Sequence, residues 1–538
     1  MTTRKRILLT SVFGPYAQDD EYGSRAINPM ELYQNQVTRE QGVFSLRMFH
    51  RSWGIMLIQA NISAPSVLLD FPSRERFISE IQKNRYDVVG ITSIIANVGK
   101  VKEMCALIRQ YLPQATIVVG GHVANYPDLN KKVEADYVVR GEGIEWFRRF
   151  LGEDVAQPIR HPMIQSGFKA RTLGSYLSEK QGEVAATLIP SVGCPMGCNF
   201  CATSAMFGGK GKSIQFFKTG RELFDIMCQM EKEMKVRSFF VMDENFLLYR
   251  KRALELLELM EAHQKSWSLY VFSSANVLTK YTMEELVGLG ISWVWMGLEG
   301  ETSQYTKLKG MDTLSYTHEL RQHGIRVLGS SIIGLENHTP ENIDAVIDYA
   351  VKHDTEFHQF MLYTPSFGTA LYQEHVKKGD LLADVVDADI HGQLKFNFRH
   401  PYIKNEQETE FLRQAFQRDF TVNGPSLLRV IRTSLLGWKK HKKHPNKRIQ
   451  NRYQWENRDL ATICAGAVWA AREWFKDNAH LYQKYLELLK ELYKEFGLKA
   501  RLAGPLLGRI ILSRMHAEQN RLRQGLTYEP PTFYEVKA

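Results

Sequence analysis

The chain has 538 residues, 44% of them hydrophobic and 24% charged, which is enough for about two or three globular domains with sizeable cores. Its net charge of +10 indicates an anionic partner, and six cysteines are too few for a disulfide scaffold. No apolar run reaches the roughly 18 residues of a transmembrane helix, and the basic N-terminal segment lacks the long apolar run and cleavage site of a signal peptide. We therefore expect a cytoplasmic protein.

Residues 4 to about 150 alternate strand and helix patterns, with an irregular polar insertion of about forty residues after the first strand. This alternation predicts a doubly wound, Rossmann-like parallel sheet, whose ligands would bind at the carboxyl ends of the strands. Glycines at those ends would let backbone approach a flat ligand, although ordinary tight turns would explain them too. The expected strands are 6–11, 66–70, 87–93, 115–121 and 136–143, and the expected helices are 55–60, 77–82 and 98–111.

A CxxxCxxC motif follows the next expected strand, after a polar linker. Thiolates of Cys194, Cys198 and Cys201 could bind three irons of a four-iron cluster, and no fourth cysteine lies nearby. One iron would then stay open for a substrate or cosubstrate. A zinc site is disfavoured because it usually needs four ligands and commonly CxxC pairs.

Six strand-and-helix units, counting the cysteine strand, follow one another up to about residue 375. Six are too few for a closed eight-stranded barrel, so a partial barrel open on one side is expected, with the active site at the carboxyl ends of its strands. Polar clusters do fall there. The five further strands are 237–242, 268–273, 293–297, 327–333 and 359–363.

The cysteine motif, together with the aromatic Phe200 before its last cysteine, resembles the radical SAM superfamily, whose members bind S-adenosylmethionine (SAM) at the open iron of a [4Fe–4S] cluster. Beside it, the N-terminal glycine-bearing sheet resembles the cobalamin-binding domain of the cobalamin-dependent radical SAM family. We thus expect α/β architecture throughout these two parts, followed by a mostly α-helical C-terminal region. The expected domains are 1–150 (cobalamin-binding), 151–184 (linker), 185–380 (partial (β/α)6 barrel) and 381–538 (helical).

The resemblance also implies site residues. Asp243 or Glu244 would pair with the SAM ammonium group, while Ser273, Ser274 and Glu299 would face its ribose or adenosyl group. The DxHxxG motif that supplies a cobalt-ligating histidine in some cobalamin proteins is absent, so no histidine is expected on cobalt and the dimethylbenzimidazole tail is expected to be displaced. The implied cobalamin contacts are Thr92, Ser93, Gly120, Gly121, His122, Gly141 and Glu142.

The implied activity is methylation of an unactivated carbon of a small-molecule or lipid substrate, after reductive cleavage of SAM to a 5′-deoxyadenosyl radical. Two alternatives stay open: radical cyclisation, oxidation or carbon–carbon coupling without methyl transfer, and a non-catalytic sensor that binds the cluster or cobalamin. An electron donor such as flavodoxin or ferredoxin is also implied. Methylthio transfer is disfavoured because it needs a second cluster, and the N-terminal domain has only Cys105.

The C-terminal region contains a basic stretch, 429–452, with nine Lys or Arg residues and no acid. One interpretation is a solvated loop between ordinary core helices. The other is a surface that contacts an anionic membrane peripherally. Nucleic-acid binding is disfavoured because no recognised reader motif accompanies the charge.

Overall fold

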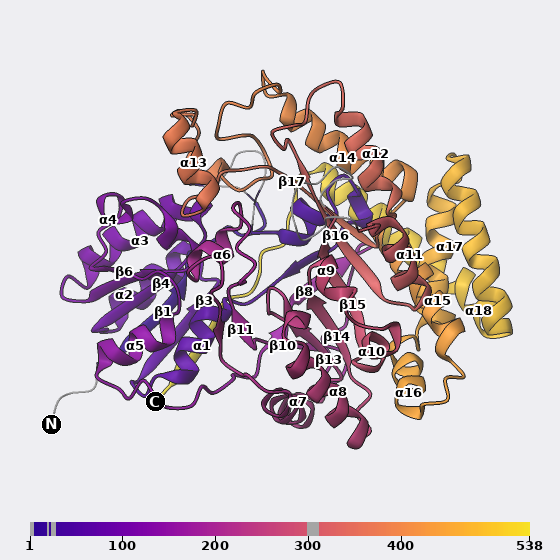
Figure 1. Cartoon of the computed structure of the whole chain (residues 1–538), viewed down its shortest axis with the longest axis horizontal. Coiled ribbons are helices and arrows are strands. Elements are labelled where there is room, and N and C mark those ends of the chain that lie inside the picture. Colours follow the sequence, from indigo (N-terminus) through magenta and orange to yellow (C-terminus); the bar gives the residue numbers. More distant parts are fainter. Residues whose placement is uncertain (1–4, 19–20, 23–27, 29, 299–310) are drawn as a thin grey trace.

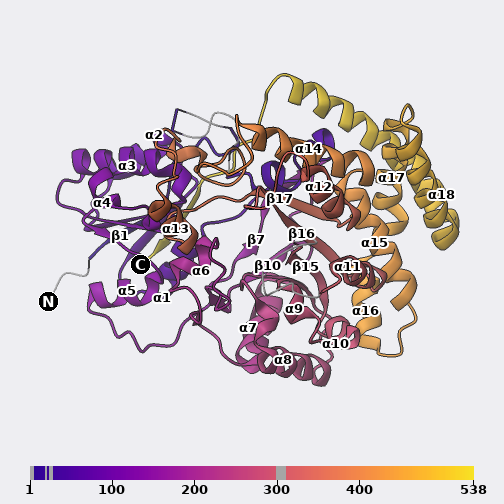
Figure 2. The same ribbon diagram turned by 45° about the horizontal axis from the view of Figure 1, so that its top comes forward.

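The computed structural model describes residues 5–18, 21–22, 28, 30–298 and 311–538. Two sheets dominate it, one from the N-terminal part and one from the middle of the chain, and a group of helices flanks the second sheet (Figure 1). Figure 2 shows the same arrangement from a second direction, with the last helices along the outer edge. No helix in the described part of the chain combines the length and apolarity needed to cross a bilayer.

The first sheet has the order β18-β3-β1-β4-β5-β6, and its five N-terminal strands are parallel. Its central strands are buried on both faces, as expected of apolar, β-branched runs in a parallel sheet. Helices α2 and α3 pack on one face and α1 and α5 on the other, which confirms the doubly wound prediction. The bounds are β1 Ile7–Ser11, β3 Ser66–Asp70, β4 Val88–Thr92, β5 Thr116–Gly120, β6 Tyr137–Val138, α1 Trp53–Asn61, α2 Arg74–Lys83, α3 Val98–Tyr111, α4 Leu129–Lys132 and α5 Gly143–Leu151.

The sixth strand of this sheet comes from the opposite end of the chain. Strand β18 (Phe533–Lys537) pairs antiparallel with β3, and Figure 1 accordingly places the C-terminus beside the first sheet. The Lys537 Nζ donates to the backbone oxygens of Gln59 (2.8 Å) and Ile62 (2.5 Å), which fixes the strand to the end of α1. Sequence analysis did not predict this strand, and the proposed domain boundaries stay a prediction.

The second sheet has the order β17-β16-β15-β14-β13-β10-β7, in which six parallel strands are extended by the antiparallel β7. It confirms the predicted partial barrel, and helices α7, α8, α10, α11 and α12 cover its outer face. The bounds are β10 Ala185–Leu188, β13 Ser238–Val241, β14 Ser268–Phe272, β15 Ile291–Gly297, β16 Arg326–Ile333, β17 Phe357–Leu362, α7 Gly220–Met234, α8 Arg250–Ala262, α9 Ala275–Leu278, α10 Met283–Gly288, α11 Thr313–Gln322, α12 Ile343–Lys352 and α13 Ala370–Lys378.

The insertion after β1 and the predicted linker both contain short elements. A π-helical turn (η1) from the insertion packs against the inner face of the barrel, close to β17. Strand β2 of the insertion pairs with β8 of the linker, so the two segments support each other. The bounds are η1 Tyr33–Val37, η2 Gly42–Phe44, β2 Arg47–Phe49, β7 Gln165–Ser166, β8 Phe168–Thr172 and β9 Ser175–Tyr176.

The region after residue 380 is mostly helical, as predicted. The basic stretch forms two helices, and several of its cations are buried or paired with acidic side chains. Arg429, Arg448 and Arg452 are at most 3% exposed, and Lys439 and Lys442 pair with glutamates of α18. Lys440, Lys443 and Lys447 are exposed, and the membrane contact at 429–452 stays a prediction. The bounds are α14 Gln407–Asn423, α15 Ser426–His441, α16 Lys447–Glu456, η7 Leu460–Cys464, α17 Ala465–Trp474 and α18 Ala479–Arg523, with a break at Gly497.

Candidate functional site

The three cysteines of the CxxxCxxC motif lie in the loop between β10 and α6 (Ala202–Met206), at the carboxyl end of the barrel sheet. All three thiols are free and half-buried. Ser204 joins the two ends of the motif, because its N–H donates to the Cys201 Sγ (3.4 Å) and its hydroxyl donates to the Cys194 oxygen (2.7 Å). The loop is thus folded into one compact turn.

One glycine directly before the motif and one inside it permit this turn. Gly193 has φ +81° and Gly197 has φ +65°, values that side chains other than glycine adopt with strain. A Cβ at Gly193 would lie 2.6 Å from the Cβ of Phe207, and one at Gly197 would lie 2.5 Å from the Cα of Lys210. The conformation of the loop therefore requires glycine at these two positions, in addition to the three cysteines.

The chemistry of the loop fits an iron–sulfur cluster. Burial, together with smaller effects of the neighbouring Cys201 and Cys198, raises the pKa of Cys194 to about 11. Binding to iron removes this penalty because the metal stabilises thiolates. The described part of the chain contains no group of three His, Cys, Asp or Glu side chains arranged around one point, as a single metal ion would require. In a four-iron cluster each cysteine binds a different iron.

The two carboxylates predicted for SAM differ sharply. Asp243 forms a buried ion pair with Arg252, Nη2 to Oδ2 2.5 Å, and is 2% exposed. Glu244 has a buried Oε2 without a hydrogen-bond partner among the described residues, and burial raises its pKa to about 7. Because Glu244 also raises the pKa values of Cys194 and Cys201, its carboxylate faces the cysteine loop. Glu244 is the carboxylate available to a ligand.

The predicted serines lie beside these carboxylates. Ser273 Oγ donates to Asn245 Oδ1 (3.1 Å), and the N–H of Ser274 donates to the same oxygen (3.2 Å). The Asn245 Nδ2 in turn donates to Ser274 Oγ (3.1 Å). Asn245 therefore links the ends of β13 and β14, a role that its position between a strand and a short helix did not reveal. Glu299 lies outside the described residues.

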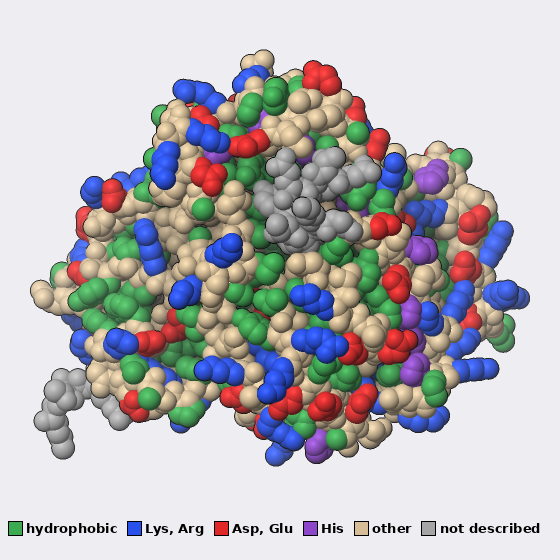
Figure 3. Space-filling view, in the orientation of Figure 1, with side chains coloured by type: hydrophobic (Ala, Val, Ile, Leu, Met, Phe, Trp, Pro, Cys, Tyr) green, Lys and Arg blue, Asp and Glu red, His purple; other side chains and the backbone are tan. Residues whose placement is uncertain are grey.

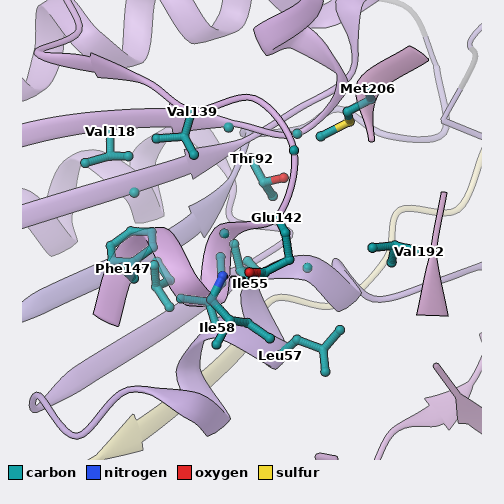
Figure 4. Close-up of a pocket in the computed structure, with 18 of the residues that line it drawn as sticks. Ile55, Leu57, Ile58, Thr92, Val118, Val139, Glu142, Phe147, Val192 and Met206 are labelled. Atoms are coloured by element: carbon teal, nitrogen blue, oxygen red, sulfur yellow. Dashed lines mark hydrogen bonds between the residues drawn. The ribbon is translucent and has the colours of Figure 1, made fainter. Parts of the chain in front are cut away.

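A cavity of about 150 Å³ lies at the carboxyl ends of β4 and β5 in the first sheet (Figure 4). Five predicted cobalamin contacts line it: Thr92, Gly120, Gly121, Gly141 and Glu142. Predicted residues Ser93 and His122 are not among its lining residues. The backbone of Ser93 lies directly against Gly121 instead. A Cβ on Gly121 (φ +80°) would be only 2.7 Å from the Ser93 oxygen.

Most of the cavity wall is apolar and was missed, because aliphatic side chains carry no chemical signal in a sequence. Ile55, Ile58 and Phe147 form its floor on α1 and α5. An engineered cavity of about 150 Å³ with such a lining accommodates benzene in another protein, so this one fits a flat aromatic ring. Glu142 caps α5, because its Oε2 accepts from the Glu145 N–H at 2.8 Å.

The wall of the cavity nearest the barrel comes from the cysteine region. Val192 and Met206 lie on either side of the motif, and Phe207 and Phe216 follow it; all four line the cavity. Figure 4 shows Met206 and Val192 across from the strands of the first sheet. The glycine-bearing loops and residues that flank the cysteine loop thus line one cavity, although the three cysteines are not among its lining residues.

The Rossmann-like sheet and the cysteine loop of the partial barrel lie on either side of one cavity. Residues 42–151 match the B12 binding domain, and residues 188–350 match the radical SAM superfamily. The chain therefore carries a B12-binding domain followed by a radical SAM domain. The predicted cofactors are confirmed: cobalamin, a [4Fe–4S] cluster and SAM. Which residues hold them stays a prediction.

Curated relatives share the same part of the chain. An uncharacterised methyltransferase of Pyrococcus horikoshii is 24% identical over 56% of this chain and 72% of its own length. The bacteriochlorophyllide d C-8(2)-methyltransferase of Chlorobaculum tepidum is 25% identical over 68% and 83%, respectively. The anaerobic magnesium-protoporphyrin IX monomethyl ester cyclase of Cereibacter sphaeroides is 22% identical over 63% and 59%.

The fold is also found in a solved structure. The radical SAM methyltransferase TsrM of Kitasatospora setae, determined with cobalamin and a [4Fe–4S] cluster bound, superimposes with a TM-score of 0.51 at 16% identity. The match covers 84% of this chain and all of TsrM. This likeness confirms the predicted fold class.

Proposed function

We propose that the protein is a cobalamin-dependent radical SAM C-methyltransferase. The observation that carries this proposal is the cavity lined both by the glycine-bearing loops of the first sheet and by Val192, Met206 and Phe207, which flank the cysteine loop. A shared cavity brings a methyl donor held by one domain within reach of a substrate held at the barrel mouth. The methyltransferase relatives support the same conclusion.

The residues have separate tasks in this proposal. Cys194, Cys198 and Cys201 bind three irons, and Glu244 accepts the ammonium group of SAM at the fourth. The apolar cavity takes the displaced dimethylbenzimidazole base of cobalamin, and Gly120 and Gly121 let the backbone approach it. When bound, the cofactors supply the radical that removes a substrate hydrogen and the methyl group that replaces it.

The inner face of the barrel indicates the substrate class. Its strands present stacked rings, with Trp293 5.7 Å from Tyr270 and 5.2 Å from Phe357, and Phe272 5.0 Å from Trp295. Outward-facing residues of these strands are buried under helices, whereas four of these inner rings are only half-buried. Aromatic faces favour apolar and ring-containing ligands. We therefore favour a hydrophobic small-molecule or lipid substrate that contains rings.

Polar groups on the same face would orient that substrate. Trp295 Nε1 donates to Ser330 Oγ (2.7 Å), which donates to Gln359 Oε1 (3.1 Å). Nearby, His50 stacks on Phe240 with both ring nitrogens buried and unpartnered among the described residues, and burial lowers its pKa to about 4. This face therefore offers only a few hydrogen-bonding groups, among them a neutral imidazole and an indole N–H. It suits a substrate that has few such groups itself.

A second candidate is radical cyclisation without methyl transfer. Two curated relatives are named as magnesium-protoporphyrin IX monomethyl ester cyclases, and they match 63% and 62% of this chain, respectively. Both candidates need one-electron reduction of the cluster, and a flavodoxin or ferredoxin is the proposed donor.

Labelled SAM separates the two candidates. Anaerobically reconstituted protein with cobalamin, a low-potential reductant and SAM carrying a deuterated methyl group is incubated with apolar extracts of the host. Mass spectrometry then follows 5′-deoxyadenosine, S-adenosylhomocysteine and label. Methyl transfer requires the two SAM products in matched amounts and label in an extracted molecule. Substrate-dependent 5′-deoxyadenosine without either would contradict the proposal and favour cyclisation.

Two cysteine variants control this experiment. Cys198→Ala removes one iron ligand and should abolish SAM cleavage. Cys228→Ala changes a half-buried thiol of α7 outside the motif and should retain it. If Cys198→Ala still formed 5′-deoxyadenosine at the normal rate, the cluster assignment would be wrong.

A further inference from the structure

The second half of α18 exposes large apolar side chains in a row. Leu498, Leu502, Leu506 and Ile510 are 72%, 65%, 64% and 48% exposed. They are four residues apart, so they share one side of the helix over a length of about 18 Å. Single exposed leucines are common, but a continuous row of four marks a contact surface.

The opposite side of the same helix packs closely on the rest of the helical region. Ala500 is fully buried, and Gly504 and Gly508 are buried as well. A Cβ on Gly508 would lie 2.4 Å from Trp469 Cε3, and one on Gly504 would lie 2.9 Å from the Tyr493 hydroxyl. Leu507 and Ile511 also pack inward, against Gly466 of α17, so the helix is apolar on its packed side and on its exposed side, unlike an ordinary surface helix.

The charges around the row have one sign. Residues 498–514 contain four basic side chains, all exposed, and no Asp or Glu. They are Lys499, Arg501, Arg509 and Arg514, and none forms an ion pair with a carboxylate of the described residues. Several Lys and Arg side chains project from the edge of the molecule where α18 lies (Figure 3).

We infer that this surface, residues 498–514 of α18, docks the protein on an anionic lipid membrane. An apolar row flanked by cations is what a helix needs to lie in the interface, with its apolar side among the acyl chains and its charges at the headgroups. A second copy of the chain is a poor partner because it would bring eight unpaired cations together, four from each copy. This surface is separate from the stretch 429–452, where several cations are buried or paired with acidic residues.

Vesicle co-sedimentation of the full-length holoprotein tests this inference. Phosphatidylcholine vesicles with and without about one third phosphatidylglycerol are compared at low and high salt. Wild type should bind the anionic vesicles, and high salt should weaken binding because the cations are screened. Leu502→Glu/Leu506→Glu should reduce the partition coefficient more than about tenfold, since it places two charges in the apolar row. Arg501→Gln/Arg509→Gln should weaken binding to anionic vesicles alone.

The matched control is Val386→Glu/Val422→Glu, which adds the same charges at valines that are 60% and 48% exposed elsewhere. It should bind like wild type. All variants change exposed side chains, so the melting temperature and cobalamin content should stay unchanged. Equal binding by the Leu502/Leu506 variant and wild type would overturn the inference. So would failure of wild type to bind anionic vesicles, or a lipid-free dimer of wild type that this variant converts to monomer.

Discussion

Arg252 of α8 holds Asp243 in a buried ion pair, whereas the adjacent Glu244 has a backbone hydrogen bond with Gly193 beside the cysteine loop and keeps one buried oxygen, Oε2, without a partner among the described residues. Two neighbouring carboxylates thus have opposite roles. One stabilises the end of β13, and the other is available to a ligand.

Asp243→Asn should destabilise the protein without changing the ligand-facing carboxylate. The substitution leaves the Arg252 guanidinium buried without its counter-charge, which costs about 3 kcal/mol. Urea unfolding measures this loss. A variant as stable as wild type would mean that the ion pair does not support the fold.

Glu244→Gln should have the converse effect. Removing the charge should weaken SAM binding about tenfold or more, because a charge-assisted hydrogen bond contributes more than a neutral one. The unfolding free energy should change little, since the Gln amide oxygen can still accept the backbone hydrogen bond from Gly193. Equilibrium dialysis with SAM gives the comparison, and unchanged affinity would assign the ammonium group to another residue.

The parallel strands of both sheets could be predicted because short runs such as Ile7–Ser11 and Val88–Thr92 are mostly apolar and rich in β-forming residues. The choice between Asp243 and Glu244 could not, since it depends on Arg252, which lies on the following helix. Nor could β18, because pairing with β3 depends on a contact between the two ends of the chain. The site was located by its cysteines and glycines, while the aliphatic walls of its cavity remained hidden.

Acid should destabilise the segment that leads into the cysteine loop. His161 Nε2 accepts from the Ile189 N–H (2.9 Å), and burial lowers the pKa of His161 to about 4. Between pH 6.5 and about 4 the unfolded chain takes up a proton that the folded chain does not, so stability falls as pH falls. Because other buried histidines act similarly, the test is a difference: wild type should lose about 2 kcal/mol more than His161→Gln from pH 6.5 to 4.5. Parallel curves would contradict this.

Two adjacent glycines should respond differently to alanine. At Gly121, positive φ and a Cβ 2.7 Å from the Ser93 oxygen predict lost stability together with lost cobalamin binding. At Gly120 the nearest atom to a Cβ is the Val139 oxygen at 3.8 Å, so the variant should fold normally. Its methyl group enters the cavity and should weaken cobalamin binding alone. Thermal unfolding and absorbance titration separate the two, and equal stability loss in both would be contrary to the structure.

Deleting residues 530–538 should destabilise the first sheet. The deletion removes the hydrogen bonds between β18 and β3, each contributing about 1 kcal/mol, and the Lys537 contacts to α1. Hydrogen exchange of β3 amides should accelerate. Glu535→Gln, which removes only an ion pair with Arg51, should change stability by less than about 1 kcal/mol. Unchanged exchange after the deletion would show that the strand is dispensable.

The position of β18 also sets an order of assembly. Strands β1 to β6 leave the ribosome first, yet the free edge of β3 must wait until the barrel and the helices have been translated. An unpaired strand edge is a site of aggregation while it waits. Pairing of β18 with this edge joins two segments that lie far apart in the sequence. The first sheet therefore begins to form before the barrel is translated and is completed only afterwards.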